Sequence, residues 1–259
     1  MTPIQRDTQR KQAELAARTQ QVFTPAAANV GNLDRAMRYK LGSDRARLKK
    51  IASWQRKAEV KAEIVPEYIA YLDGVMIAGG GDEILTQVMI WAYDALHIPT
   101  FSTLARYALN NGVALPTEFA RPLGAWLVES TAKLMLKVIE SEIKGLDSPS
   151  ITELQNLTLW LETETTNMDM HDEIRAKIHR ACGELLFNIA PSKALEHFEN
   201  ALKFDSHIRV KKRIKALTES QSPQGQAAGG NNDVAPPHTP SASLTAVPPA
   251  STSTTDGVQ

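Results

Sequence analysis

Between residues 31 and 219, stretches rich in Ala, Leu, Glu, Lys, Arg and Gln are separated repeatedly by proline, glycine or helix-capping side chains. Those six residue types favour helix. Pro99 suits the first turn of a helix, and Gly112 suits the position just after one. Aromatic residues make up only 6% of the 259 residues, whereas strands are enriched in aromatic and β-branched side chains. The sequence therefore predicts an all-α fold, a helical bundle, and nearly excludes a β-sandwich.

The last 40 residues differ sharply from the rest, with six prolines, eleven Ser or Thr and two charged residues. Such a segment cannot bury enough apolar surface to offset its chain entropy. At the other end, a helix over residues 1–22 would find few apolar partners and would be closed by Pro25. We expect four parts: a flexible basic arm (1–30), a basic helix plus helical core domain (31–149), a TPR-like helical region (150–219) and a disordered Pro/Ser/Thr-rich tail (220–259).

A tetratricopeptide-like pattern lies in the helix expected over 191–204. Its A-x3-F-x2-A-L core is formed by Ala194, Phe198, Ala201 and Leu202. No second repeat follows in register, and a single unit cannot form a solenoid. We therefore expect a packing hairpin with the preceding helix, over 170–189.

Charge is divided unevenly although the formal net charge is zero. Residues 1–63 carry 14 Lys or Arg against 6 Asp or Glu, whereas residues 64–205 carry 10 against 20. This division suits a protein that touches a polyanion with one part and protein partners with another.

The strongest chemical signal is a basic helix expected over residues 44–63, with Ser43 as its N-cap. Its cations could contact DNA phosphates and release counterions, with Trp54 beside them, although a solvated helix face is the plain alternative. The candidate DNA-binding residues are Arg45, Arg47, Lys49, Lys50, Arg56, Lys57 and Lys61.

A second basic patch precedes the tail and could bind nucleic acid or an acidic partner, or be a solvated final helix. It contains Arg209, Lys211, Lys212 and Arg213, followed by Lys215.

Catalytic signals are weak. Gly79-Gly80-Gly81 has no following Lys-Ser or Lys-Thr, so it is read as a turn and not a nucleotide site. Asp82, Glu83 and Asp94 are the candidate ligands if the chain holds Mg²⁺ as a nuclease, but their spacing does not bring them together. Helix capping and surface solvation are the favoured explanation of these carboxylates.

No metal site is identified from the histidines. His171 and His179, with Asp172, are eight residues apart, beyond the spacing of a helical zinc pair. We expect His179 and His197 at helix surfaces or edges, and Cys182 in the core.

Several segments together resemble one family, that of the phage terminase small subunits (M proteins, or terminase endonuclease subunits) of tailed phages with cohesive DNA ends. The resemblance covers about residues 35–218. It rests on the basic amino-terminal region, Gly74-Val75, Asp82-Glu83-Ile84-Leu85, Val88-Met89-Ile90-Trp91, Ala105-Arg106-Tyr107-Ala108-Leu109, the run from Asp172 to His179, Ala194-Leu195-Glu196-His197-Phe198 and Val210-Lys211-Lys212.

This resemblance implies a subunit that binds double-stranded viral DNA at cos and directs its cleavage and packaging with an ATPase large subunit. It also implies a homo-oligomer in the host bacterial cytoplasm, encoded by a phage or prophage, with no intrinsic cofactor unless the chain is a Mg²⁺ nuclease. The single cysteine and the absence of a membrane-length apolar run agree with such a compartment. Relatives are expected to end in a basic tail, which this chain lacks.

Two alternatives stay open. The chain could itself cut DNA, since the family carries the label of endonuclease subunit, although the nuclease could instead reside in the large subunit. It could also be a TPR-like helical adaptor without a nucleic-acid partner.

Overall fold

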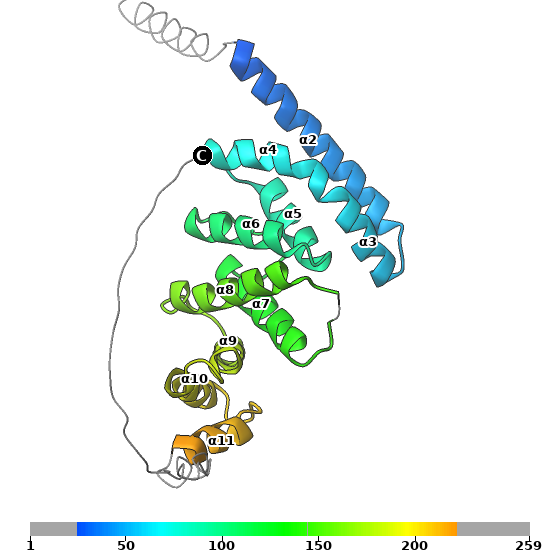
Figure 1. Ribbon diagram of the computed structural model, residues 1–259. Helices are drawn as coiled ribbons and strands as arrows, with labels where there is room; N and C mark the ends of the chain where they lie inside the picture. The colour runs from blue at the N-terminus through cyan, green and yellow to red at the C-terminus, as the bar shows by residue number, and fades with distance from the viewer. Residues whose placement is uncertain (1–24, 144, 222–259) are drawn as a thin grey trace, which may run out of the picture. The chain divides into compact units, whose positions relative to one another are not determined.

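The computed structural model describes residues 25–143 and 145–221, with side chains from residue 31. These residues form ten α-helices and no strand, as expected for an all-α fold (Figure 1). The helices are α2 Pro25–Lys49, α3 Trp54–Ile64, α4 Pro66–Ile77, α5 Glu83–Asp94, α6 Ile98–Asn110, α7 Leu123–Ile139, α8 Ser148–Glu164, α9 Asp172–Leu186, α10 Pro191–Phe204 and α11 Lys211–Gln221. Most of the expected arm, the helix over 1–22 and the expected tail from 222 lie outside the described residues.

Several helix boundaries follow from local chemistry, and those at Pro99 and Gly112 confirm the sequence predictions. The carboxylate of Asp82 accepts a hydrogen bond from the Ile84 N–H at 2.9 Å and so caps α5. Pro66 and Pro99 stand in the first turns of α4 and α6, where a missing N–H costs nothing. Gly112 follows α6 with φ +63°, the left-handed conformation that glycine adopts without strain.

The basic helix was predicted wrongly, because the structure divides it between two helices. Ser43 lies within α2 and not at a helix start, and the chain turns after Lys49. Ser53 is the true N-cap, because its hydroxyl accepts from the Arg56 N–H at 3.3 Å and opens α3. Pro25 is the first residue of α2, as its fixed φ permits at a first turn.

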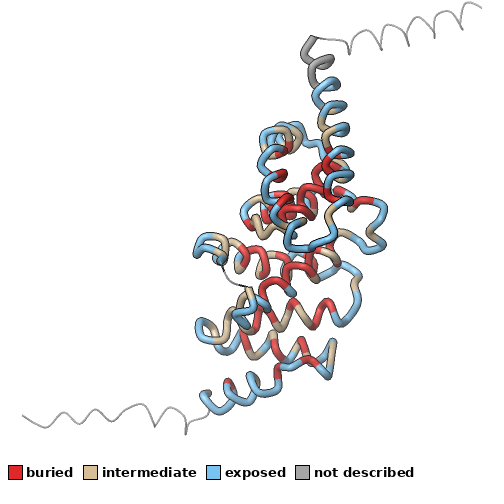
Figure 2. The backbone as a smooth tube through the Cα atoms, turned by 90° about the vertical axis from the view of Figure 1, so that its right-hand side faces the viewer, coloured by how far each residue is buried: buried red, intermediate tan, exposed pale blue. Residues whose placement is uncertain are grey.

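The main core is centred on α5, in which nine of the twelve residues are buried. Around it, α2 to α9 contribute to one continuous cluster of buried side chains, seen as red segments in Figure 2. Tyr68, Phe101 and Leu127 are among its largest members. None of the helices in the described ranges is both long and apolar enough to cross a membrane.

A second apolar cluster joins α9, α10 and α11. Ala194, Phe198 and Ala201 are fully buried there, as the repeat-like pattern predicted, whereas Leu202 is half-buried. Gly183 of α9 makes room for the Phe198 ring, because a β-carbon at this position would lie 2.5 Å from a ring atom. The α9–α10 pair is therefore a closely packed hairpin.

Candidate nucleic-acid interface

The chain turns between α2 and α3 (Figure 1). Basic and aromatic side chains gather along the sequence at this turn, which we call the α2–α3 corner: Lys49, Lys50, Trp54 and the half-buried Lys57. Lys49 and Lys50 are exposed, and their side chains make no ion pair or hydrogen bond with the part of the chain that the structure describes. Trp54 is 84% exposed at the start of α3. The Lys57 ammonium lies 5.4 Å from its ring centroid, within cation–π range.

The other predicted DNA-binding cations are engaged with carboxylates. The Arg45 guanidinium lies 2.6 Å from the Glu83 carboxylate and also donates to the Gln87 side chain. Lys61 pairs with Asp94. Two further pairs, Arg47 with Glu63 and Arg56 with Glu59, each have N···O distances of 2.9 Å. Lys49 and Lys50 therefore have no ion-pair partner among the described residues. The other four cations, Arg45, Arg47, Arg56 and Lys61, each pair with a carboxylate.

The three candidate Mg²⁺ ligands, Asp82, Glu83 and Asp94, are themselves members of ion pairs. Asp82 caps α5 and pairs with Arg38, whereas Glu83 and Asp94 pair with cations of α2 and α3. Asp82 and Asp94 bound the two ends of α5, and twelve residues of helix rise about 18 Å. The structure does not bring the three carboxylates to one point.

The second basic patch lies at the start of α11. Arg209, Lys211 and Lys212 are exposed, with no side-chain partner among the described residues. Arg213 is different: its guanidinium pairs with Glu184 at 2.8 Å and lies over the Phe187 ring, so it fastens α11 to α9. Cations in a first turn oppose the helix dipole, so α11 itself gains nothing from Lys211 and Lys212.

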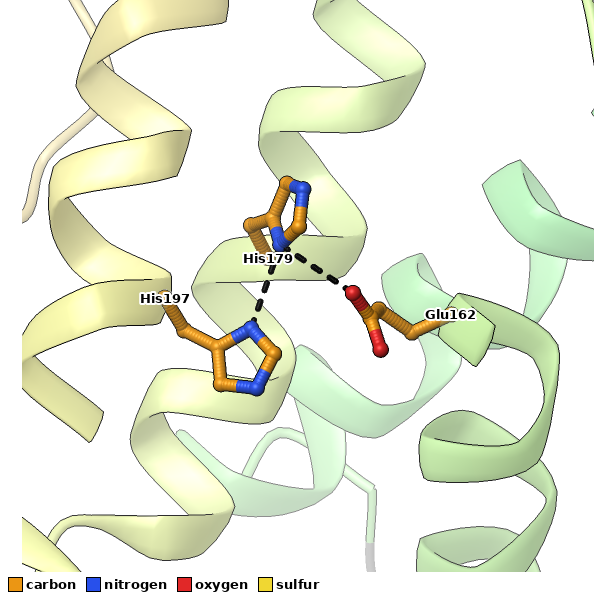
Figure 3. A group of neighbouring side chains, drawn as sticks. All are labelled: Glu162, His179 and His197. Atoms are coloured by element: carbon orange, nitrogen blue, oxygen red, sulfur yellow. Dashed lines mark hydrogen bonds and ion pairs between the residues drawn. The ribbon is translucent and has the colours of Figure 1, made fainter. Parts of the chain in front are cut away.

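A group that the sequence did not predict lies between α8, α9 and α10 (Figure 3). The Nδ1 atoms of His179 and His197 are 3.1 Å apart, and His179 Nδ1 lies 3.7 Å from a Glu162 carboxylate oxygen. Both histidines are half-buried, and the hairpin brings together two side chains whose contact the sequence did not predict. Burial, followed by nearby positive charge, lowers the pKa of His179 to about 4.

One signal in the sequence could have indicated this meeting. His179 stands one helical turn before Gly183, and His197 directly precedes Phe198, the residue that packs on Gly183. Residues four apart share a helix face, so the hairpin register predicts that the histidines approach. His171 stays apart, exposed at the N-cap of α9. Cys182 is buried, as expected.

Comparison with known proteins gives two matches. The sequence profile of the family described as "Phage small terminase subunit" matches residues 38–173. A protein of Escherichia phage P2 named "Terminase, endonuclease subunit" is 30% identical over 226 residues, which cover 86% of this chain and 87% of that relative. No solved structure matches the chain.

Proposed function

The chain belongs to the family of phage small terminase subunits, and on this premise we propose that it binds double-stranded viral DNA at the cos site. In the same proposal, it directs cleavage and packaging of that DNA by an ATPase large subunit. The observation that carries the DNA-binding role is the α2–α3 corner, where Lys49 and Lys50 have no partner among the described residues beside an exposed Trp54.

The corner has the chemistry that a DNA backbone requires. Two ammonium groups free of carboxylates can approach phosphates without first breaking an ion pair, and each contact releases condensed counterions. Aromatic side chains such as Trp54 are enriched at interfaces relative to the rest of a protein surface. Lys57, held over the Trp54 ring, adds a third positive charge to the same surface.

The paired cations serve a different role in this proposal. Arg45 and Lys61 tie α2 and α3 to opposite ends of α5. They hold the corner in place, and phosphate contact is assigned to Lys49 and Lys50. Exposed ion pairs contribute at most about 1 kcal/mol each, so the attachment depends on several such pairs acting together.

Arg209, Lys211 and Lys212 form a second surface for DNA or for an acidic partner. The first N–H groups of a helix bind anions, and three free cations surround the start of α11. The acidic body from residue 64 to 205 would face the large subunit or further copies of this chain in a homo-oligomer. We place this assembly in the host cytoplasm.

The name of the P2 relative favours a second candidate, in which this chain cuts DNA itself. That activity would require Mg²⁺ and carboxylates such as Asp82, Glu83 or Asp94. Each of these carboxylates is paired with a cation, so metal binding there would have to displace Arg38, Arg45 or Lys61. We therefore assign cleavage to the assembly with the large subunit.

Fluorescence anisotropy tests the proposal directly. The purified chain is titrated onto a duplex carrying its phage's own end sequence and onto a scrambled duplex of equal length, across a salt series with Mg²⁺ present. Samples from the same titration are run on a gel to detect cuts. We expect salt-dependent binding that favours the native duplex, without cutting.

Other outcomes decide between the alternatives. Cutting by the chain alone, lost in Asp82→Ala or Asp94→Ala, would establish the nuclease. Absence of binding to either duplex at low salt would contradict the proposal and leave the TPR-like adaptor.

A further inference from the structure

The cluster of Glu162, His179 and His197 carries the donor atoms of a transition-metal site. Two imidazole nitrogens and one carboxylate oxygen are the ligand set of several zinc sites that keep a fourth position for water. Each of the three residues comes from a different helix, α8, α9 and α10 (Figure 3). One ligand atom from each lies within 4.8 Å of the others.

The separations within the cluster fit a tetrahedral ion. Nitrogen and oxygen ligands lie about 2.0–2.1 Å from zinc, so two of them at a tetrahedral angle are about 3.4 Å apart. The observed distances from His179 Nδ1, 3.1 Å to His197 Nδ1 and 3.7 Å to the Glu162 oxygen, bracket this value. Two of the three ligand separations therefore already suit one ion, and the third lies within 4.8 Å.

Hydrogen bonding among the three side chains joins the two imidazoles and leaves the carboxylate to solvent. A proton shared between the two Nδ1 atoms accounts for their 3.1 Å contact. The carboxylate of Glu162, only 22% exposed, is then 3.7 Å from His179, which is too far for a hydrogen bond. It accepts no hydrogen bond from another described side chain. A metal ion would satisfy both imidazoles and the carboxylate at once.

The residues around the cluster affect how tightly it would bind a metal ion and which parts of the fold the ion would join. The His179 side chain is 12% exposed, and its ring is stacked on Phe204 with centroids 5.7 Å apart. Arg175 and Lys203 place positive charge nearby, so we expect weaker binding than at closed four-ligand zinc sites. Glu162 follows Leu161 of the main core, whereas His197 precedes Phe198 of the second cluster.

From this geometry we propose that Glu162, His179 and His197 bind one divalent ion of the zinc class, with water in the fourth position. The ion fastens α10 and the second apolar cluster to α8 and the main core. Its role is structural, and it is independent of the DNA surface at the α2–α3 corner.

The test uses the full chain, stripped with a chelator and dialysed, with Zn²⁺ as the probe. Bound metal is measured by mass spectrometry after desalting, and thermal unfolding is followed with and without Zn²⁺. We expect one ion per chain, and a rise in Tm of about 5–10 °C at a hundredfold excess over Kd.

Matched variants locate the ion. Glu162→Gln and His197→Gln, both at partly exposed positions, should retain helical circular dichroism but lose the bound ion and the Tm rise. The control, His171→Gln with His207→Gln, removes two exposed imidazoles and should retain both. Absence of stoichiometric zinc in the wild type would overturn the proposal and leave two imidazoles sharing a proton. Zinc retained by Glu162→Gln and His197→Gln, or lost in the control, would overturn it equally.

Discussion

Phe198 packs its ring against Gly183, the position in α9 that carries no side chain. This contact closes the α9–α10 hairpin and supports the second apolar cluster. Alanine normally stabilises a helix relative to glycine by about 1 kcal/mol. At Gly183 the added carbon would lie 2.5 Å from the ring, and overpacking of this kind costs about 1–3 kcal/mol.

We predict that Gly183→Ala lowers the free energy of unfolding by roughly 1–2 kcal/mol, since the steric cost exceeds the gain in helix propensity. Urea denaturation measures the effect. Gly74→Ala is the matched control, because Gly74 lies in α4 with no atom within 4 Å of an added β-carbon. That variant should gain up to about 1 kcal/mol. Equal changes in the free energy of unfolding for the two variants would show that the Phe198 ring does not constrain α9 at Gly183.

Asp44 is a buried polar residue that joins α2 to α4. Its carboxylate accepts from the Tyr68 hydroxyl at 2.9 Å and from the Lys40 ammonium at 2.7 Å. Burial, followed by the hydrogen bond to Asp44, raises the pKa of Tyr68 well above its usual value, so the hydroxyl keeps its proton and donates.

Removing this acceptor leaves a buried hydroxyl unsatisfied, which costs about 1–3 kcal/mol. We predict that Asp44→Ala destabilises the protein by this amount, measured by urea denaturation. Asp73→Ala, at an exposed carboxylate of α4, should change stability by less than about 0.5 kcal/mol. An unchanged free energy of unfolding in Asp44→Ala would contradict the prediction and mean that water replaces the carboxylate as the acceptor for Tyr68.

At the scale of elements, the first turn of α11 carries positive charges that destabilise the helix through its dipole. Lys211, Lys212 and Arg213 stand in its first turn with no acidic residue among them. Only Arg213 has a packing role, through Glu184 and Phe187. The two lysines are therefore explained better by an anionic partner than by the helix.

We predict that Lys211→Glu with Lys212→Glu raises the stability of α11 by about 0.3–1 kcal/mol per substitution, because acidic groups complement the dipole at this end. The same change should weaken DNA binding. Lys193→Glu, in the first turn of α10, serves as the control that stabilises without changing DNA affinity. Thermal unfolding and anisotropy give the two readouts. Unchanged DNA affinity in the α11 variant would exclude this patch from the DNA surface.

Local chemistry predicted many of the elements. Pro66, Asp82 and Pro99 begin helices through their own backbone or side chain, so their boundaries could be read from the sequence. The break after Lys49 could not, because a capping serine is weak against the helix-favouring residues on both sides. The meeting of His179 with Glu162 depends on the packing of three helices, and no spacing along the chain encodes it.

At the scale of the whole molecule, ion pairs within the described residues join the basic segment to the acidic body. Three cations of the basic segment pair with carboxylates at the ends of α5: Arg38 with Asp82, Arg45 with Glu83 and Lys61 with Asp94. The division of charge in the sequence thus does not reveal that these three cations are paired within the fold.

The central claim is that Lys49 and Lys50 at the α2–α3 corner contact DNA phosphates. The most direct test is the slope of log K against log salt for the wild type, for Lys49→Gln with Lys50→Gln, and for a control with Lys133→Gln and Lys137→Gln. The control removes two exposed cations of α7. We predict that the corner variant loses about 1.8 from the magnitude of the slope, about 0.9 per phosphate contact, while the control matches the wild type. A corner variant with the wild-type slope, or a control that loses as much, would contradict the account.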